Sequence, residues 1–152
     1  MSISIDDAKL KCVEEMVYEY PREEVISAIS KINDCKTLYV FAFNYNWDNG
    51  FEIPNTILES NVCTLETALL MFFRADGVSF LKDKTLNGNL PEWSSFIKRL
   101  YDRIIERRFQ VGGIKFEAPV SSVQAHTLKK SLNDEEQVFF DSYDGEDLDI
   151  EV

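Results

Sequence analysis

Residues 64–77, which read TLETALLMFFRADG, contain a predicted helix. Thr64 can cap the start of this helix, because its hydroxyl can accept a backbone N–H of the first turn. Asp76-Gly77 is expected to end it, since glycine adopts the left-handed conformation without steric cost. Apolar residues recur at three- and four-residue spacing, which predicts an inward face of Leu65, Ala68, Leu69, Phe72 and Phe73.

Three helices and one short helix are predicted on the N-terminal side of this segment. Ser4 can cap the first, and Tyr20 ends it because a residue before proline disfavours helical geometry. Pro21 suits the start of the second helix, and Asp34 the cap of the third. The short helix is expected over residues 54–60. The predicted inward residues of the three longer helices are Leu10, Val13, Val17 and Tyr20, then Val25, Ile29 and Ile32, then Leu38, Phe41, Ala42 and Tyr45.

The C-terminal half contains the longest predicted helix, residues 91–108, which follows a loop-like stretch at residues 85–90. After it, apolar and polar residues alternate about Gly112-Gly113, which predicts a small β-hairpin near residues 108–117. The alternative is a helix C-cap at Gly112 followed by coil. The expected inward residues of the long helix are Trp93, Phe96, Ile97, Leu100 and Ile104.

The predicted fold class is mainly α, a single-domain helical bundle. A chain of 152 residues fits one domain, and its 45% hydrophobic content supports a packed core. A last helix, with Val120, Val123 and Leu128 inward, is expected over residues 119–132. Residues 1–133 would then form a helical domain, and residues 134–152 an acidic C-terminal segment that is partly docked and partly flexible.

Charge is strongly segregated along the chain. Residues 134–152 hold nine acids and no Lys or Arg, whereas the other 133 residues carry eighteen acids and sixteen bases. Such a segment repels nucleic acid and anionic lipid and attracts a basic partner. It also contains Val138, Phe139, Phe140 and Tyr143, which are expected to dock on the domain or on a partner. Beyond Tyr143 we expect a solvated run of charge.

Few residues suggest catalysis or metal binding. Cys12, Cys35 and Cys63 lack zinc-ligand spacing, and their odd number favours reduced, mostly buried thiols in a cytoplasmic protein. His126 is the only histidine and is expected on the surface of a helix. The acidic N-terminus lacks the pattern of an export signal, and the longest apolar run, residues 68–73, is far below the roughly 20 residues that span a bilayer. We therefore expect no cofactor, no metal, no catalytic residue and no membrane partner.

Residues 41–54, FAFNYNWDNGFEIP, are the densest polar and aromatic stretch. Tyr45, Trp47, Asp48 and Glu52 could line a ligand pocket, since aromatic rings beside amides suit the stacking of sugars or bases. Asp48 and Glu52 could also do acid–base chemistry, a weaker hypothesis because nothing in the sequence supports the pair. The structural interpretation is that the aromatics are core, that Asp48 and Asn49 form a turn, and that Gly50 supplies an unusual backbone angle.

A second charged feature lies on the predicted helix at residues 91–108. Its outward face carries Lys98, Arg99, Arg103, Arg107 and Arg108, interrupted by Asp102 and Glu106. The favoured interpretation is a solvated face with ion pairs between residues four apart. The alternative is that this face receives the acidic segment of the same molecule.

Residues 41–77 resemble a family of small bacterial proteins with the core F-x-x-N-Y-N-W-D-x-G-F-x-x-P, then a short helix, a Cys and T-A-L-x-x-F-x-x-A-D-G. The matching positions are Phe41, Asn44, Tyr45, Asn46, Trp47, Asp48, Gly50, Phe51 and Pro54, then Cys63, Thr67, Ala68, Leu69, Phe72, Ala75, Asp76 and Gly77. Some similar proteins look like immunity proteins encoded beside polymorphic or contact-dependent toxins. The resemblance implies no enzyme activity and does not cover the acidic segment.

Resemblance and charge together predict a cytoplasmic, non-enzymatic immunity protein that binds and neutralises a cognate toxin, of a basic nuclease type. The hypothetical toxin-binding residues are Asp134, Glu135, Glu136, Phe139, Phe140, Asp141, Tyr143, Asp144, Glu146 and Asp147. The alternative is a small-molecule or carbohydrate binding module that uses Tyr45, Trp47, Asp48 and Glu52. The sequence predicts no oligomeric state.

Overall fold

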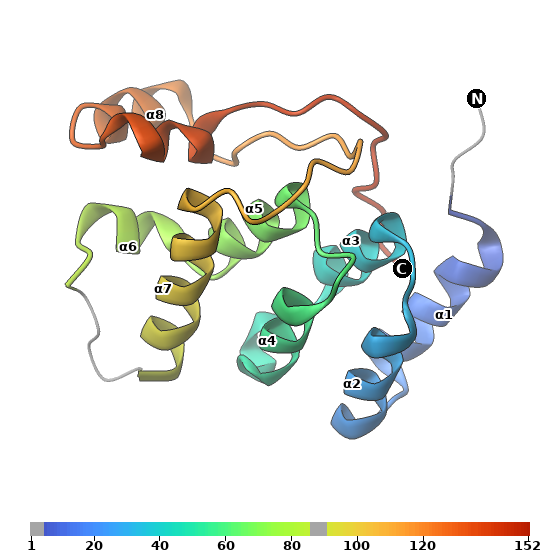
Figure 1. The fold of residues 1–152 in the computed structure, drawn as a ribbon. Helices are drawn as coiled ribbons and strands as arrows, with labels where there is room; N and C mark the ends of the chain where they lie inside the picture. The colour runs from blue at the N-terminus through green and yellow to red at the C-terminus, as the bar shows by residue number, and fades with distance from the viewer. Residues whose placement is uncertain (1–4, 86–90) are drawn as a thin grey trace.

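The computed structural model of the protein describes residues 5–85 and 91–152, and this part of the chain is built from helices (Figure 1). The elements are α1 (Asp7–Tyr18), α2 (Arg22–Lys31), α3 (Cys35–Asn44), η1 (Trp47–Asn49), α4 (Glu52–Glu59), α5 (Leu65–Arg74), α6 (Gly77–Lys82), α7 (Pro91–Ile105), α8 (Ser122–Lys129) and η2 (Asp134–Phe140), where η marks a 3-10 helix. No strand forms in these two ranges, so the prediction of a mainly α, single-domain fold is confirmed. No helix among the described residues is long and apolar enough to cross a membrane.

Helix α5 lies at the centre of the fold, between α3 and α7 (Figure 1). Thr64 caps it as predicted, with its hydroxyl oxygen 3.5 Å from the backbone N of Thr67. Every residue from Glu66 to Phe72 is buried, on all sides of the helix. A helix buried all round is an interior helix rather than an amphipathic surface helix. The predicted one-sided apolar face was therefore too narrow.

The N-terminal helices begin close to the predicted positions. Asp34 caps α3, and its carboxylate accepts the backbone N–H of Thr37 at 2.8 Å. Pro21 directly precedes α2, as expected. The predicted cap of the first helix is wrong: Asp6 caps α1 by accepting the backbone N–H of Lys9 at 2.9 Å. Ser4 lies outside the described residues.

The end of α5 differs from the prediction in a specific way. Asp76, not Gly77, adopts the left-handed conformation, with φ of 60°. Gly77 is instead the first residue of α6, a helix that the sequence analysis did not predict. A Cβ at Gly77 would lie 2.2 Å from the ring of Phe72. Glycine is thus needed there because α6 approaches α5 closely.

Helix α7 begins at the predicted residue and ends earlier than expected, at Ile105. Arg107 has a φ of 58°, a left-handed conformation that does not continue a helix. Of the predicted inward residues of α7, Phe96, Ile97, Leu100 and Ile104 are buried. Of the predicted loop at residues 85–90, residues 86–90 lie outside the described part of the chain.

The hairpin predicted near residues 108–117 does not form. Its residues make isolated bridges with the C-terminal segment instead, Ile114 with Glu146 in parallel and Phe116 with Tyr143 in antiparallel. A local hairpin is prevented because the carboxylate of Glu66 accepts the backbone N–H groups of Gly112 and Ile114. The backbone of Lys115 and Phe116 then pairs with a more distant part of the chain.

The last α-helix is shorter than the predicted span of residues 119–132. Ser121 and Gln124 form a capping box, in which each side chain accepts the other's backbone N–H at 3.1 Å. Leu128 is buried as expected, but Val123 is 75% exposed, so its predicted inward position is wrong.

Candidate functional site

A buried carboxylate connects α5 to the segment that precedes α8. Glu66 is fully buried, and its Oε1 accepts the backbone N–H of Gly112 at 2.9 Å. Its Oε2 accepts the N–H of Ile114, also at 2.9 Å. A buried carboxylate needs such donors, because burial without them is strongly unfavourable. Sequence analysis missed this residue, since a Glu in the first turn of a helix is usually an exposed residue that favours the helix dipole.

The segment held by Glu66 in turn holds the acidic C-terminal segment, defined as residues 134–152. The Lys115 N–H donates to the carbonyl of Glu146, and the Glu146 N–H donates to the carbonyl of Gly113, each at 2.9 Å. Phe116 and Tyr143 exchange two backbone hydrogen bonds of the same length. A Cβ at Gly145 would lie 2.2 Å from the carbonyl oxygen of Gly113, so the two backbones are in close contact.

The end of the acidic C-terminal segment is bound by a residue of the N-Y-N-W-D motif. Asn44 at the end of α3 donates its side-chain N–H to the carbonyl of Ile150 at 2.7 Å and accepts the N–H of Val152 at 3.1 Å. Tyr39, five residues earlier, donates its hydroxyl to the carboxylate of Asp149 at 3.0 Å. Asn44 therefore pairs with the chain much as a neighbouring strand would.

The last six residues alternate in burial. Leu148 is fully buried and Ile150 and Val152 are half-buried, whereas Asp147, Asp149 and Glu151 are exposed. This period of two is the signature of an extended segment with one face on a core. It is visible in the sequence D-L-D-I-E-V, and it was the signal that could have predicted the docking of this end.

The structure separates the residues predicted to bind a toxin. Phe139 is fully buried, with its ring centroid 4.4 Å from that of Phe72. Glu136 is also buried and accepts hydrogen bonds from the Tyr101 hydroxyl at 2.7 Å and from the Lys84 ammonium at 2.9 Å. Burial alone would raise the pKa of Glu136, but the hydrogen bonds from Lys84 and Tyr101 outweigh it and lower that pKa. These two side chains therefore belong to the interior.

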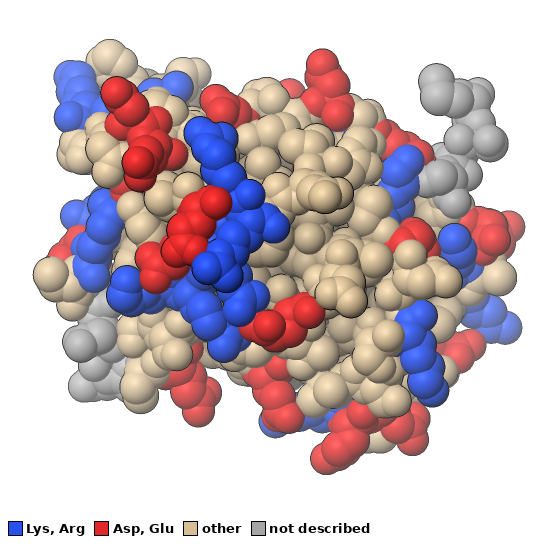
Figure 2. Space-filling view, viewed as in Figure 1, with Lys and Arg blue, Asp and Glu red and all other residues tan. Residues whose placement is uncertain are grey.

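The remaining members of the predicted toxin-binding set reach the surface to different degrees. Phe140, Tyr143 and Glu146 are half-buried, and Glu146 pairs with Lys36 at 2.9 Å. Seven acids of the acidic C-terminal segment are exposed, and among the described residues none of them forms an ion pair; they are Asp134, Glu135, Asp141, Asp144, Asp147, Asp149 and Glu151. Acidic side chains are spaced along the upper edge of the molecule in Figure 2, where this segment runs in Figure 1. The division of the chain at residue 133 stays a prediction.

Four of the five aromatic residues of the 41–54 stretch pack together, whereas Phe43 lies against the guanidinium of Arg74. The Tyr45 side chain is 7% exposed, and its hydroxyl donates to the carbonyl of Gly50 at 2.7 Å. The Trp47 ring lies edge-on to Tyr45, with centroids 5.3 Å apart, and also contacts Phe51 and Phe96. Gly50 has a φ of 91°, the unusual angle expected for the turn. These contacts match the structural interpretation of the stretch.

The four residues of the alternative ligand site do not share one site. Asp48 and Glu52 are exposed and line an open depression of about 850 Å³, where Glu52 lies 3.4 Å from the guanidinium of Arg22. Tyr45 lines a different, smaller pocket. Trp47 lines neither of these two pockets.

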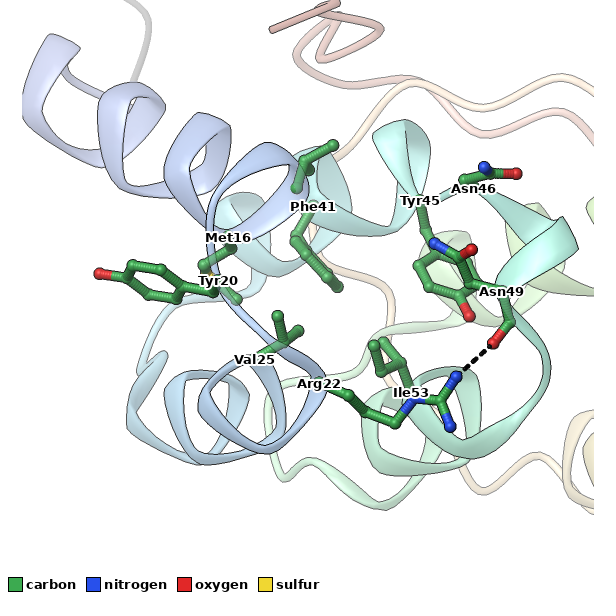
Figure 3. A pocket seen from close by; sticks show the side chains of 10 residues that line it. Met16, Tyr20, Arg22, Val25, Phe41, Tyr45, Asn46, Asn49 and Ile53 are labelled. Atoms are coloured by element: carbon green, nitrogen blue, oxygen red, sulfur yellow. Dashed lines mark hydrogen bonds between the residues drawn. The ribbon is translucent and has the colours of Figure 1, made fainter.

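The smaller pocket has a volume of about 240 Å³ and lies where α1, α2, α3 and α4 converge (Figure 3). Its apolar lining consists mainly of buried side chains, and its polar lining residues are one Arg, two Asn and two Tyr; in Figure 3 the Tyr20 hydroxyl and the Asn46 amide point away from the cavity. The residues are Met16, Val17, Tyr20, Arg22, Val25, Phe41, Tyr45, Asn46, Asn49 and Ile53. Among these described lining residues Arg22 is the only charged one.

The basic residues of α7 form a band in Figure 2 and are largely paired. Arg103 lies 2.8 Å and Arg99 3.7 Å from the carboxylate of Glu59 in α4. Lys98 pairs with Asp102 four residues on, at 3.2 Å, which is the predicted type of contact. The acidic C-terminal segment forms its ion pairs with Lys36 and Lys84 instead. Arg99 and Arg103 therefore connect α7 to α4.

The cysteines and the histidine do not form a site in the described part of the chain. Burial raises the pKa of the Cys63 thiol to about 12, so it stays protonated at neutral pH. Cys35 is half-buried, and Cys12 is exposed, which corrects its predicted burial. His126 is exposed on α8, as expected. Among the described residues no group of three or more His, Cys, Asp or Glu could hold a metal ion.

Comparison with known proteins gives a match to a protein family. Residues 33–105 match the family described as Domain of unknown function (DUF4274). No curated protein and no solved structure matches the chain. The matched span runs from the start of α3 to the end of α7, and so includes the N-Y-N-W-D motif and the buried helix α5. The central helices of this chain are thus similar to that family, and the acidic C-terminal segment lies outside the match.

Proposed function

We propose that this protein is a non-enzymatic, cytoplasmic immunity protein that binds and neutralises a basic protein toxin of the nuclease type. The observation that carries the proposal is the set of seven exposed carboxylates on the acidic C-terminal segment that form no ion pair among the described residues. The backbone of this segment is docked on the helices. The resemblance of the N-Y-N-W-D motif region to immunity proteins supplies the class of partner. The described residues supply the charge that such a partner needs.

Electrostatic complementarity explains how such a surface would act. A nuclease is basic where it contacts phosphate, so an acidic protein surface can occupy the same face. The seven exposed carboxylates form no ion pair among the described residues, and their negative field speeds the encounter with a basic protein at low ionic strength. Because the segment is already ordered by Glu66, Asn44 and Gly145, binding loses little conformational entropy.

The extent of the family match along the chain supports the same proposal. The family match covers α3 to α7 and ends before residue 134. Helices common to the family would then form a scaffold, and the segment outside the match would provide the recognition surface. Phe140 and Tyr143, both half-buried, lie among these acids and offer apolar contact area to a partner.

Truncation of residues 134–152 is not a suitable test, because Phe139 and Leu148 are core residues and their loss would unfold the protein. Charge neutralisation is better. The test variant converts five exposed acids to their amides: Glu135, Asp141, Asp144, Asp147 and Glu151. Its matched control neutralises five exposed acids of α1 and α2 and their flanks: Asp7, Glu14, Glu19, Glu23 and Glu24. Asp149 is kept, since it accepts the Tyr39 hydroxyl.

The partner would first be captured from the source strain with the unaltered protein and identified. Association with that partner is then measured at low and high salt, and protection is measured in cells that express it. We expect the test variant to lose about tenfold or more in association rate and to lose protection, while the control retains both. Equal behaviour of the two variants would refute the acidic surface. A captured partner that is not toxic to cells would refute the immunity function itself.

A further inference from the structure

We propose that the 240 Å³ pocket between the first four α-helices binds a small organic carboxylate with an apolar body, with Arg22 as the group that pairs with the anion. This site differs from the predicted aromatic site, because Trp47, Asp48 and Glu52 do not line it. It shares no lining residue with the acidic C-terminal segment. The proposal therefore stands independently of the toxin-binding function.

The floor of the pocket is built from four different helices. Met16 of α1, Val25 of α2, Phe41 of α3 and Ile53 of α4 each contribute a side chain that is at most 6% exposed. A pocket whose walls belong to packed helices is preformed, which is typical of small-molecule sites. Its volume is below the roughly 300–1,000 Å³ of pockets for drug-sized ligands, so it suits a smaller molecule.

The mouth of the pocket supplies the specificity. The Arg22 guanidinium donates to the backbone carbonyl of Asn49 at 3.2 Å, as the dashed line in Figure 3 shows, and to the Glu52 carboxylate at 3.4 Å. Both contacts are long, and a guanidinium has five N–H donors, so donors remain for a ligand. The amide of Asn49 stands at the same rim, whereas the side chain of Asn46 points away from Arg22 in Figure 3.

The charge of the lining selects the ligand class. Arg22 is the only charged residue among the described residues that line the pocket, and the floor is apolar. A carboxylate can pair bidentately with a guanidinium, whereas a neutral amide of the same shape gains less and a cation is repelled. Glu52 competes from outside the pocket, but this exposed ion pair is weak. A monoanion with a hydrocarbon or aromatic body is thus the complementary ligand.

The test uses protein labelled at its methionine methyl groups and observed by NMR. Met16 lines the pocket, and Met71, buried in α5 and absent from the pocket lining, is an internal reference. Benzoate is the probe, with benzamide and benzylamine as neutral and cationic isosteres. We expect benzoate to shift the Met16 signal saturably without shifting the Met71 signal. The two isosteres should bind at least about tenfold more weakly than benzoate.

Two substitutions make the assignment specific. Arg22→Gln should weaken benzoate binding about tenfold, whereas Glu52→Gln should tighten it because Arg22 is freed from its competitor. Arg99→Gln, which removes a paired cation of α7 outside the pocket, is the control and should leave binding unchanged. Each variant is checked for an unaltered thermal transition. Equal binding of benzoate and benzamide, no Met16 shift with benzoate, or no effect of Arg22→Gln would overturn the proposal.

Discussion

Glu66 and Ile114 are joined inside the protein by a 2.9 Å hydrogen bond between a side-chain carboxylate oxygen and a backbone N–H. The two residues are 48 positions apart. Through this contact the buried helix α5 holds the segment that precedes α8. Gly113 and Lys115 of that segment form backbone hydrogen bonds with Glu146 of the acidic C-terminal segment. The acidic charge is thereby a fixed part of the protein surface.

Glu66→Ala should destabilise the protein strongly. The substitution leaves the N–H groups of Gly112 and Ile114 buried without acceptors and removes side-chain packing, at a cost of about 2–4 kcal/mol in the free energy of unfolding. Chemical denaturation followed by circular dichroism measures this. Glu14→Ala, at an exposed position of α1, is the control and should change stability by less than about 0.5 kcal/mol. A loss of stability for Glu66→Ala no larger than that of the control would show that the hydrogen bonds to Glu66 contribute little to the free energy of unfolding.

Gly145→Ala should loosen the acidic C-terminal segment locally. A Cβ at this position would lie 2.2 Å from the carbonyl oxygen of Gly113, so the two backbones must move apart. We expect faster hydrogen exchange at the amides of Tyr143 and Glu146, which donate to Phe116 and Gly113. Ser142→Ala, at a neighbouring exposed position, should leave their exchange unchanged. Unchanged exchange in both variants would contradict the close backbone contact.

Stability should fall in acid partly through Glu136. Its pKa is lowered in the folded protein, because hydrogen bonds from Lys84 and Tyr101 outweigh burial. A lowered folded pKa stabilises the protein above the unfolded value, roughly 4.3 for Glu, and this contribution is lost as the pH falls through that value and then the folded one. The Glu136→Gln variant should therefore show a shallower loss of stability over this acid range. Parallel pH profiles for the two proteins would rule out this role.

Stability should also fall in alkali through buried tyrosines. Burial raises the pKa of Tyr45 to about 12, and burial beside Asp149 raises the pKa of Tyr39 further. A raised folded pKa stabilises the protein below the unfolded value of about 10, and this contribution is lost as the pH rises towards the folded value. Titration of phenolate absorbance in the native protein should show a late phase that is absent in denaturant. A single phase near the ordinary pKa would contradict the burial of these rings.

Local features of the fold could be predicted from the sequence, because the groups that determine them lie within one helical turn. Asp34 with Thr37 and Thr64 with Thr67 are caps of this kind. The features that were missed depend on contacts between distant residues. The bridges of Ile114 and Phe116 form with partners about 30 residues away, and the Glu66 carboxylate accepts the N–H of Ile114, 48 positions on, so neither follows from local propensity.

The candidate site shows the same difference between what local sequence predicts and what tertiary contacts determine. The positions of the charged residues in the sequence located the negative charge in residues 134–152, and the aromatic residues there indicated docking. Which acids reach solvent depends on tertiary contacts: Glu136 is buried because Tyr101 and Lys84 supply its hydrogen bonds. Asn44 was singled out as a motif position, but its role in holding Ile150 could only be seen in three dimensions.

The central claim is that the acidic C-terminal segment is an ordered part of the surface, and backbone ¹⁵N relaxation tests it most directly. The measurement compares heteronuclear NOE values of residues 143–150 with those of α5 in the same sample. The docked backbone of Tyr143, Glu146 and Ile150 predicts values as high as those of the helix. Values near zero or negative across residues 143–150 would mean a solvated tail and would contradict the account.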